Sequence, residues 1–122
     1  MHSQEIVEQF IASWNRMDFD SIIDALADDV VYHNMPMSPI VGREKVAEYL
    51  CNAWRFSDCN WVTVNIATSG NTVLTERVDE FFFDKKKVSL PIMGTFEVRG
   101  AKIIAWRDYF DLQSYREQLQ SI

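Results

Sequence analysis

The chain has 122 residues, of which 48% are apolar and 13% aromatic, a composition typical of one folded domain spanning residues 1–122. Its formal charge of −6 makes nucleic acid and anionic membranes unfavourable partners. No run approaches the roughly 18 apolar residues of a membrane-spanning helix, and the first five residues do not resemble a secretory signal, so we expect a cytoplasmic protein.

The cysteine content argues against a metal centre. Cys51 and Cys59 are eight residues apart and form no CxxC motif, and neither His2 nor His33 lies at a zinc-ligand spacing from them. We therefore expect two reduced thiols and no metal site.

The first third of the chain has the spacing of helices. Apolar residues recur every three or four positions in a first helix at Ile6, Val7, Phe10, Ile11 and Trp14, and in a short second helix from Phe19 to Leu26. An extended segment, Val30–Asn34, comes next, and Pro36 and Pro39 then predict an irregular loop. A third helix is expected after Gly42, with its apolar face at Val46, Tyr49, Leu50 and Trp54.

The period changes to two in the second half, which indicates strands. We expect four of them, over residues 61–67, 72–83, 88–98 and 101–111, with hairpin connections at 84–87 and 99–100 and a last helix over 112–119. Helices followed by a long meander predict an α+β fold. A curved, mainly antiparallel sheet must then wrap around the amino-terminal helices, which gives a cone with one open mouth.

Alternation places ionisable residues on a face that looks like core. Arg77 and Asp79 are two apart in one strand and so point the same way. In the last strand Asp108 falls between Trp106 and Phe110 on a face that we also expect to hold Ile104. In the extended segment, Tyr32 and Asn34 point together with Val30.

A buried charge needs a partner, and one guanidinium can serve two carboxylates. Arg77 between Asp79 and Asp108 would form such a triad. A structural ion-pair network, or an outward polar strand face, fits the same pattern. If the triad is catalytic, repulsion and burial leave the two acids one proton to share, which supplies an acid and a base together. Tyr32 and Asn34 could hold a water against the carboxylate.

The sequence offers no cofactor motif. The four glycines are scattered, so no phosphate-binding loop is present, and there is no GxSxG nucleophile elbow. A covalent aspartate route would need a separate base. His33 is the available residue, but alternation turns it away from Tyr32 and Asn34. We expect hydrolytic or isomerising chemistry without a cofactor.

Four blocks together resemble the limonene-1,2-epoxide hydrolase family: Tyr32–Pro36, Thr75–Asp79, Ile92–Phe96 and Trp106–Leu112. The resemblance implies the cone-shaped fold shared by nuclear transport factor 2, ketosteroid isomerase and the SnoaL-like polyketide cyclases, and a homodimer built through the sheet. It also implies that a small apolar epoxide, cyclic or terpene-like, is opened by water in one step. In that step Asp108 would be the general base, Asp79 the general acid and Arg77 the bridge, with Tyr32 and Asn34 holding the water.

Several apolar residues are candidates to line the substrate pocket: Met35, Leu74 (or Val73), Leu90, Ile92, Met93, Phe96 and Trp106. Each could equally be a core residue. Two other functions remain open, namely an isomerase or cyclase on the same fold and a non-catalytic binding or dimerisation module. An isomerase base should stand opposite a neutral acid, so an arginine between the carboxylates argues against the first of these.

Overall fold

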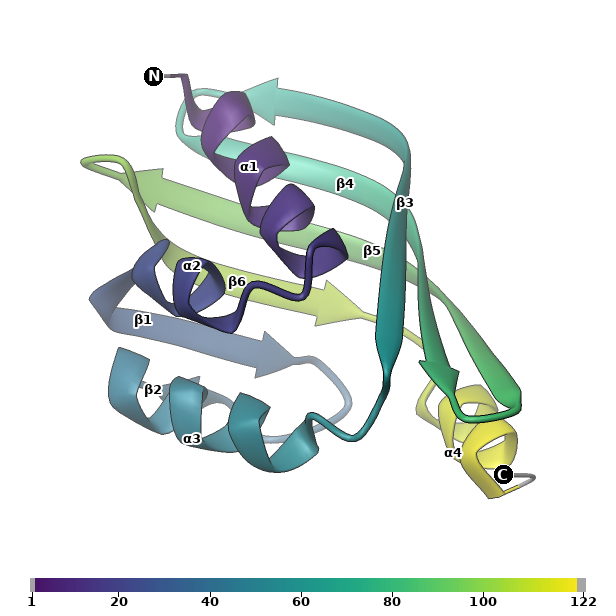
Figure 1. Ribbon diagram of the computed structural model, residues 1–122. Helices are drawn as coiled ribbons and strands as arrows, with labels where there is room; N and C mark the ends of the chain where they lie inside the picture. Colours follow the sequence, from purple (N-terminus) through teal and green to yellow (C-terminus); the bar gives the residue numbers. More distant parts are fainter. Residues whose placement is uncertain (1, 121–122) are drawn as a thin grey trace.

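The computed structural model describes residues 2–120, which form four helices and one six-stranded sheet (Figure 1). The helices and strands, in chain order, are α1 (Ser3–Asn15), α2 (Phe19–Asp24), β1 (Leu26–Asn34), β2 (Ile40–Val41), α3 (Arg43–Ala53), β3 (Asp58–Ser69), β4 (Thr72–Phe83), β5 (Lys86–Arg99), β6 (Lys102–Tyr109) and α4 (Leu112–Gln120). The α+β class expected from the sequence is confirmed.

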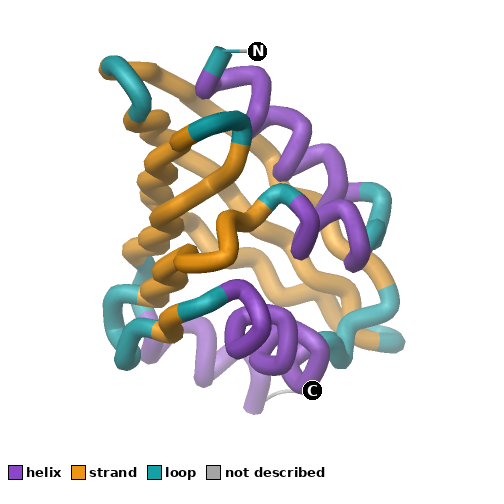
Figure 2. The backbone as a smooth tube through the Cα atoms, turned by 90° about the vertical axis from the view of Figure 1, so that its left-hand side faces the viewer, coloured by secondary structure: helices purple, strands orange, loops and turns teal. Residues whose placement is uncertain are grey.

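The sheet is mixed, with strand order β2-β1-β6-β5-β4-β3. All its neighbouring pairs are antiparallel except β1 and β6, which run parallel. The sheet curves, and α1 and α2 lie against one of its faces, while α3 and α4 lie at its lower end (Figures 1 and 2). This is the curved sheet around amino-terminal helices that the sequence predicts.

The first helix packs against the inner face of the curved sheet. The residues predicted for its apolar face, from Ile6 to Trp14, are all buried. Phe10 makes edge contacts with Phe96 and Trp106, at ring separations of 5.8 and 5.1 Å. The hydrophobic core therefore lies between α1 and the inner face of the sheet.

Leu26 was expected in the second helix but begins β1. The helix ends at Asp24, and Leu26 pairs with Ile103 of β6 and is fully buried. The spacing of Leu26 from Ile22 fits one face of a helix, but in the structure Leu26 enters the core from strand β1. The Asp18 side chain accepts a hydrogen bond from the Ser21 amide, which fixes the start of this helix.

The expected face of the last strand is wrong at one position. Ile104 was expected on the face of Trp106 and Asp108. In the structure Ile103 is buried instead, and Ile104 is only partly buried. The cause is a bulge, because Glu97 pairs with Ala105 while its neighbour Val98 pairs with Ile103, which leaves Ile104 unpaired. The alternation from Trp106 to Asp108 is unaffected.

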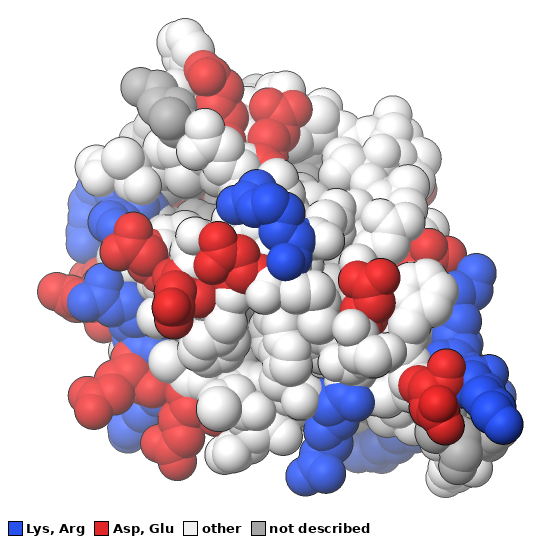
Figure 3. All heavy atoms as spheres, in the orientation of Figure 1, with Lys and Arg blue, Asp and Glu red and all other residues white. Residues whose placement is uncertain are grey.

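Opposite charges are paired at the end of the sheet where β1 and β6 begin. Arg43, Arg99 and Lys102 form ion pairs with Asp28, Asp29 and Asp24 respectively. Figure 3 shows acidic and basic side chains mixed along this left-hand side of the molecule. Among residues 2–120, no helix combines the length and the apolar character needed to cross a membrane.

Candidate active site

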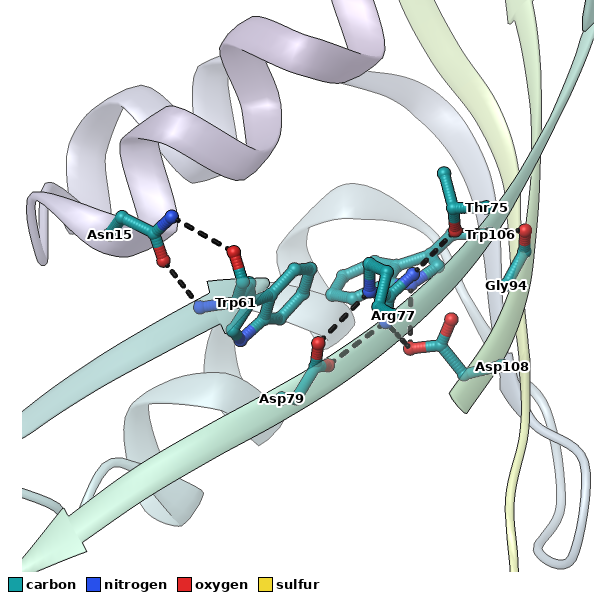
Figure 4. Close-up of polar contacts among 8 residues, drawn as sticks. All are labelled: Asn15, Trp61, Thr75, Arg77, Asp79, Gly94, Trp106 and Asp108. Carbon is teal, nitrogen blue, oxygen red and sulfur yellow. Dashed lines mark hydrogen bonds and ion pairs between the residues drawn. The ribbon is translucent and has the colours of Figure 1, made fainter. Parts of the chain in front are cut away.

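The centre of the inner sheet face carries an arginine and two aspartates. Arg77, Asp79 and Asp108 are each at most 3% exposed. β4 and β6 do not pair with each other, but both flank β5, where Ile92 lies opposite Arg77 and Gly94 opposite Asp108. The Arg77 side chain reaches across β5, so residues from two separate strands meet (Figure 4).

The guanidinium of Arg77 donates to three side chains. Nε donates to Asp79 Oδ1 at 3.0 Å, and Nη2 donates to Asp79 Oδ2 at 2.9 Å and to Asp108 Oδ2 at 3.1 Å. Nη1 donates to Thr75 Oγ1 at 3.0 Å. The triad that alternation suggested is present, and the guanidinium does bridge the two carboxylates.

Aromatic rings cover the guanidinium. The Cζ atom of Arg77 lies 4.5 Å from the ring centre of Trp61 and 5.8 Å from that of Phe96. The backbone of Trp61 is held by Asn15, whose side chain accepts from the Trp61 amide at 2.7 Å and donates to its carbonyl at 3.2 Å (Figure 4). The end of α1 therefore fixes the strand residue that shields Arg77 from water.

Burial changes the ionisation of this cluster. Desolvation raises the pKa of Asp79 to about 6, and although Arg77 opposes this shift, the nearby charge of Asp108 adds to it. Burial alone would lower the pKa of Arg77, but the carboxylates of Asp108 and Asp79 outweigh it and raise that pKa. The site thus combines a permanent cation with a carboxyl that binds a proton close to neutral pH.

The two oxygens of Asp108 differ in their contacts. Oδ2 accepts from Arg77 Nη2 and from Trp106 Nε1, both at 3.1 Å. Oδ1 is buried and has no hydrogen-bond partner among the described residues. A buried acceptor without a donor costs roughly 1–3 kcal/mol, so this oxygen is available to accept a hydrogen bond from a molecule in the site.

Tyr32 and Asn34 lie beside Asp108 on the parallel strand. Asn34 pairs with Asp108 and Tyr32 with Trp106, whose ring it stacks on at 3.9 Å. Burial, and then the charge of Asp108, raise the pKa of Tyr32 well above its ordinary value, so its hydroxyl stays protonated. The neighbouring Asn34 side chain acts in the opposite direction and lowers the pKa of Tyr32. Tyr32 and Asn34 border the same cavity as Asp79 and Asp108.

That cavity has a volume of about 110 Å³, and α3 and α4 at the lower end of the sheet contribute to its wall. Asp79, Asp108, Tyr32 and Asn34 are among the polar residues that line it. Most of the remaining wall is aromatic and comes from the sheet and the helices, with Trp14, Tyr49, Trp54, Trp61, Phe81 and Tyr115 among its residues. A small apolar molecule with one polar, reactive group fits this wall.

Comparison with known proteins assigns the family. Residues 1–120 match the model of the limonene-1,2-epoxide hydrolase catalytic domain. The chain is 36% identical over 106 residues to "Epoxide hydrolase EphG" of Mycobacterium tuberculosis, covering 87% of this chain and 71% of that protein. The chain belongs to the limonene-1,2-epoxide hydrolase family.

Solved structures agree with this family. An epoxide hydrolase of M. tuberculosis, described as similar to limonene-1,2-epoxide hydrolase, superimposes with a TM-score of 0.85 at 33% identity, over 98% of this chain and 90% of that one. A protein described as a SnoaL-like polyketide cyclase from Shewanella denitrificans gives the same TM-score at 14% identity, over 98% of both chains. The second likeness shows the shared fold alone, which confirms the cone-shaped architecture.

Three of the residues proposed to line the pocket of this family member do border the cavity, namely Leu90, Ile92 and Trp106. Leu74 and Met93 do not. Their side chains lie on the outer face of the sheet, 44% and 53% exposed, because each alternates with the inward-facing residues of its own strand. The alternative to Leu74, Val73, faces inward but belongs to the buried core.

Phe96 and Met35 are also outside the cavity wall. Phe96 is fully buried behind it, stacked against Trp106 at 6.1 Å. Met35 follows the end of β1, where its amide donates to the Asp108 carbonyl, and Met37 borders the cavity instead. His33 points away from the site, as alternation indicated, with Nε2 at 2.7 Å from the Met37 carbonyl.

Sequence reasoning missed Thr75, Gly94 and the aromatic residues of the helices. Thr75 shares the face of Arg77 in the same strand, so the alternation that identified Arg77 also contains this signal. A glycine inside a strand often marks a close approach of another group, which is the signal at Gly94. In the part of the chain that the structure describes, no group of three His, Cys, Asp or Glu residues is arranged to hold a metal ion.

Proposed function

We propose that this family member adds water to a small apolar epoxide, cyclic or terpene-like, and yields a vicinal diol in one step without a covalent intermediate. The observation that carries the proposal is the unequal environment of the two carboxylates around Arg77. Asp79 has both oxygens paired and a pKa raised to about 6, whereas Asp108 has one oxygen without a donor. Two acids whose environments differ in this way suit an acid and a base.

Asp108 acts as the general base in this mechanism. A water held by the Tyr32 hydroxyl and the Asn34 amide attacks one epoxide carbon, and its proton passes to the Asp108 carboxylate as the new C–O bond forms. The position of Asn34 beside Asp108 in the parallel pair supports this role. Positioned proton transfer of this kind contributes about 10²–10⁴-fold in rate.

Asp79 acts as the general acid. As the carbon–oxygen bond of the epoxide breaks, the ring oxygen takes the carboxyl proton of Asp79 and becomes the second hydroxyl of the diol. Asp108 then holds a proton and Asp79 is ionised, so the resting state returns when Asp108 releases a proton to water and Asp79 takes one up. Arg77 supports both charge states because it contacts both carboxylates throughout.

The cavity supports a small apolar substrate. Its wall is mainly aromatic, and its volume of about 110 Å³ favours compact molecules over long chains. Exclusion of water from such a wall also strengthens the electrostatic interactions of the triad with the epoxide.

A turnover screen tests the activity. Purified protein is offered cyclic and linear epoxides together with a ketosteroid isomerase substrate, and the diols are resolved on a chiral column. We expect diol from compact cyclic epoxides and no isomerised ketosteroid. Isomerisation without diol formation would reject the proposal in favour of the isomerase alternative.

A single turnover in heavy-oxygen water tests the mechanism. A one-step attack by water places the label in the diol during the first turnover. Label appearing first in an aspartate would indicate a covalent route through the protein. Asp108→Asn keeps the size of the side chain but removes its basicity, so we expect at least about a 10²-fold loss of kcat with an unchanged circular dichroism spectrum.

We also propose that the protein is a homodimer joined through the outer face of the sheet. Five apolar side chains are exposed on that face, from four neighbouring strands: Val62, Val64, Leu74, Met93 and Tyr109. A contiguous apolar surface of this kind typically marks a protein interface. The cytoplasm stays the predicted compartment, where Cys51 and Cys59 would remain reduced thiols.

Sedimentation velocity tests the dimer. Met93→Glu places a charge in the middle of the exposed apolar face and should convert the dimer to a monomer. Val41→Glu is the matched control, because Val41 is also exposed but lies on β2 at the sheet edge. A wild-type monomer, or a dimer unaffected by Met93→Glu, would contradict this interface.

A further inference from the structure

Thr75 is a buried polar side chain next to the triad that the proposed chemistry does not use. It lies on β4, two residues before Arg77 and on the same face, with no exposed surface. Its partner on β5 is Gly94, which also lies opposite Asp108 of β6. Thr75 and Asp108 therefore lie on the two strands that flank β5, with Gly94 between them (Figure 4).

The hydrogen bonds of Thr75 fix the direction in which its hydroxyl points. Oγ1 donates to the Gly94 carbonyl at 3.1 Å, and a hydroxyl has only one proton to give. Toward Arg77, Thr75 is therefore an acceptor, and it takes an N–H of Nη1 at 3.0 Å. The threonine has no proton left for a carboxylate.

Among residues 2–120, Oδ1 of Asp108 is a buried oxygen that lacks a hydrogen-bond donor. This oxygen, Thr75 Oγ1 and Arg77 Nη1 all lie close to Gly94. A Cβ atom added to Gly94 would lie 2.5 Å from Asp108 Oδ1 and 3.0 Å from Thr75 Oγ1, and it would lie closer still to Arg77 Nη1. Three polar atoms thus surround one point above the glycine. Nη1 is bonded to Thr75, and Asp108 Oδ1 is left unpaired.

We propose that the Thr75 hydroxyl is a positioning group that leaves the unpaired oxygen of Asp108 free to accept a proton, by holding the Arg77 Nη1 donor that would otherwise bind that oxygen. Without Thr75, the guanidinium would bind Asp108 through two N–H groups, as it already binds Asp79. Such paired donors stabilise the ionised carboxylate and make it a poorer proton acceptor. The inference rests on the proposed function, in which Asp108 takes a proton from water.

Charged and titratable groups face Asp108 from β4 and from β1. Arg77 and Asp79 face it from β4, and Tyr32 faces it from β1. A substitution at Thr75 replaces none of these residues, and among them only Arg77 is hydrogen-bonded to Thr75. A change in the pH profile of a Thr75 variant therefore reports a change in how Arg77 is shared between the two aspartates.

The test is Thr75→Val, which removes the hydroxyl and keeps the shape. With the epoxide that the wild type turns over best, we expect kcat to fall about tenfold, the effect of one added hydrogen bond to the charged base. KM should stay unchanged, and the acidic limb of the pH profile should move to lower pH. Thr75→Ser, which keeps the hydroxyl, should restore kcat and the wild-type profile. Thr95→Val is the matched control, since Thr95 belongs to the outward-facing set of β5.

Several outcomes would overturn the inference. A Thr75→Val variant with wild-type kcat and an unshifted profile would show that the hydroxyl does not tune the base. Lower kcat with an unshifted acidic limb, or a Thr75→Ser variant as slow as Thr75→Val, would show a packing role only. Thr75→Ala carries the same expectation and replaces the valine variant if that protein does not fold. A wild type inactive on every epoxide would instead reject the proposed function itself, which separates the two failures.

Discussion

Arg77 holds Asp79 through two parallel hydrogen bonds, from Nε to Oδ1 at 3.0 Å and from Nη2 to Oδ2 at 2.9 Å. Despite this pairing, burial raises the pKa of Asp79 to about 6. The free energy lost by removing the Asp79 carboxylate from water thus exceeds the stabilisation that the Arg77 guanidinium gives it. Asp79 is the group in this site that is best suited to carry a proton near neutral pH.

This pKa predicts the alkaline side of the pH–rate profile. A general acid must be protonated, so kcat/KM should fall about tenfold per pH unit above a midpoint of about 6. Measurement of kcat/KM across a buffer series from about pH 4 to 9 would give this midpoint. A profile that stays flat to the alkaline end would be incompatible with Asp79 as the acid.

The same shift predicts that stability depends on pH. The folded pKa of Asp79 lies above its model value of 3.8, so the folded state binds the extra proton. The associated stability is complete below the unfolded pKa and is lost as pH rises through about 6, by up to roughly 3 kcal/mol. Urea unfolding of the wild type and of Asp79→Asn at several pH values measures this. The two proteins should differ in slope across that window, and parallel curves would contradict the assignment.

Removal of Arg77 should destabilise the fold strongly. Arg77→Ala leaves two buried carboxylates without their cation, which costs about 3–5 kcal/mol, and the loss should shrink in acid as the carboxylates become protonated. Arg107→Ala is the matched control. Arg107 forms a partly exposed ion pair with Glu97 at 2.6 Å, and such pairs contribute about 0–1 kcal/mol. Equal losses of unfolding free energy in the two variants, measured by urea unfolding, would show that Arg77 does not stabilise the buried carboxylates.

The triad was predictable because its geometry depends on strand alternation. Arg77 and Asp79 are two apart in one regular strand, so their common face follows from the pleat. The face of Asp108 followed in the same way, even though the bulge at Ile104 changed the alternation on the amino-terminal side of Trp106. Local periodicity is enough when the functional residues lie within one unbroken stretch of strand.

The cavity wall was less predictable because it depends on how helices dock. Tyr49, Trp54 and Tyr115 reach the cavity from α3, the segment after it and α4, and no spacing within one element tells which face meets the mouth of the cone. Phe96 shows the opposite error, since it has the correct face but lies too deep, behind Trp106. Depth along the cone is a property of packing between elements, which a single sequence does not contain.

Gly94 gives the sharpest steric prediction. A methyl group there would lie 2.5 Å from Asp108 Oδ1 and closer to Arg77 Nη1, although the backbone of Gly94 has no left-handed strain. Gly94→Ala should therefore push the guanidinium off Asp108 and lower kcat by at least about 10²-fold, the scale of a lost acid or base contribution. Thr95→Ala, on the opposite face of β5, should retain wild-type activity. Steady-state kinetics together with thermal unfolding of both variants checks this, and a fully active Gly94→Ala protein would mean that the close contact of the triad with β5 is not required for turnover.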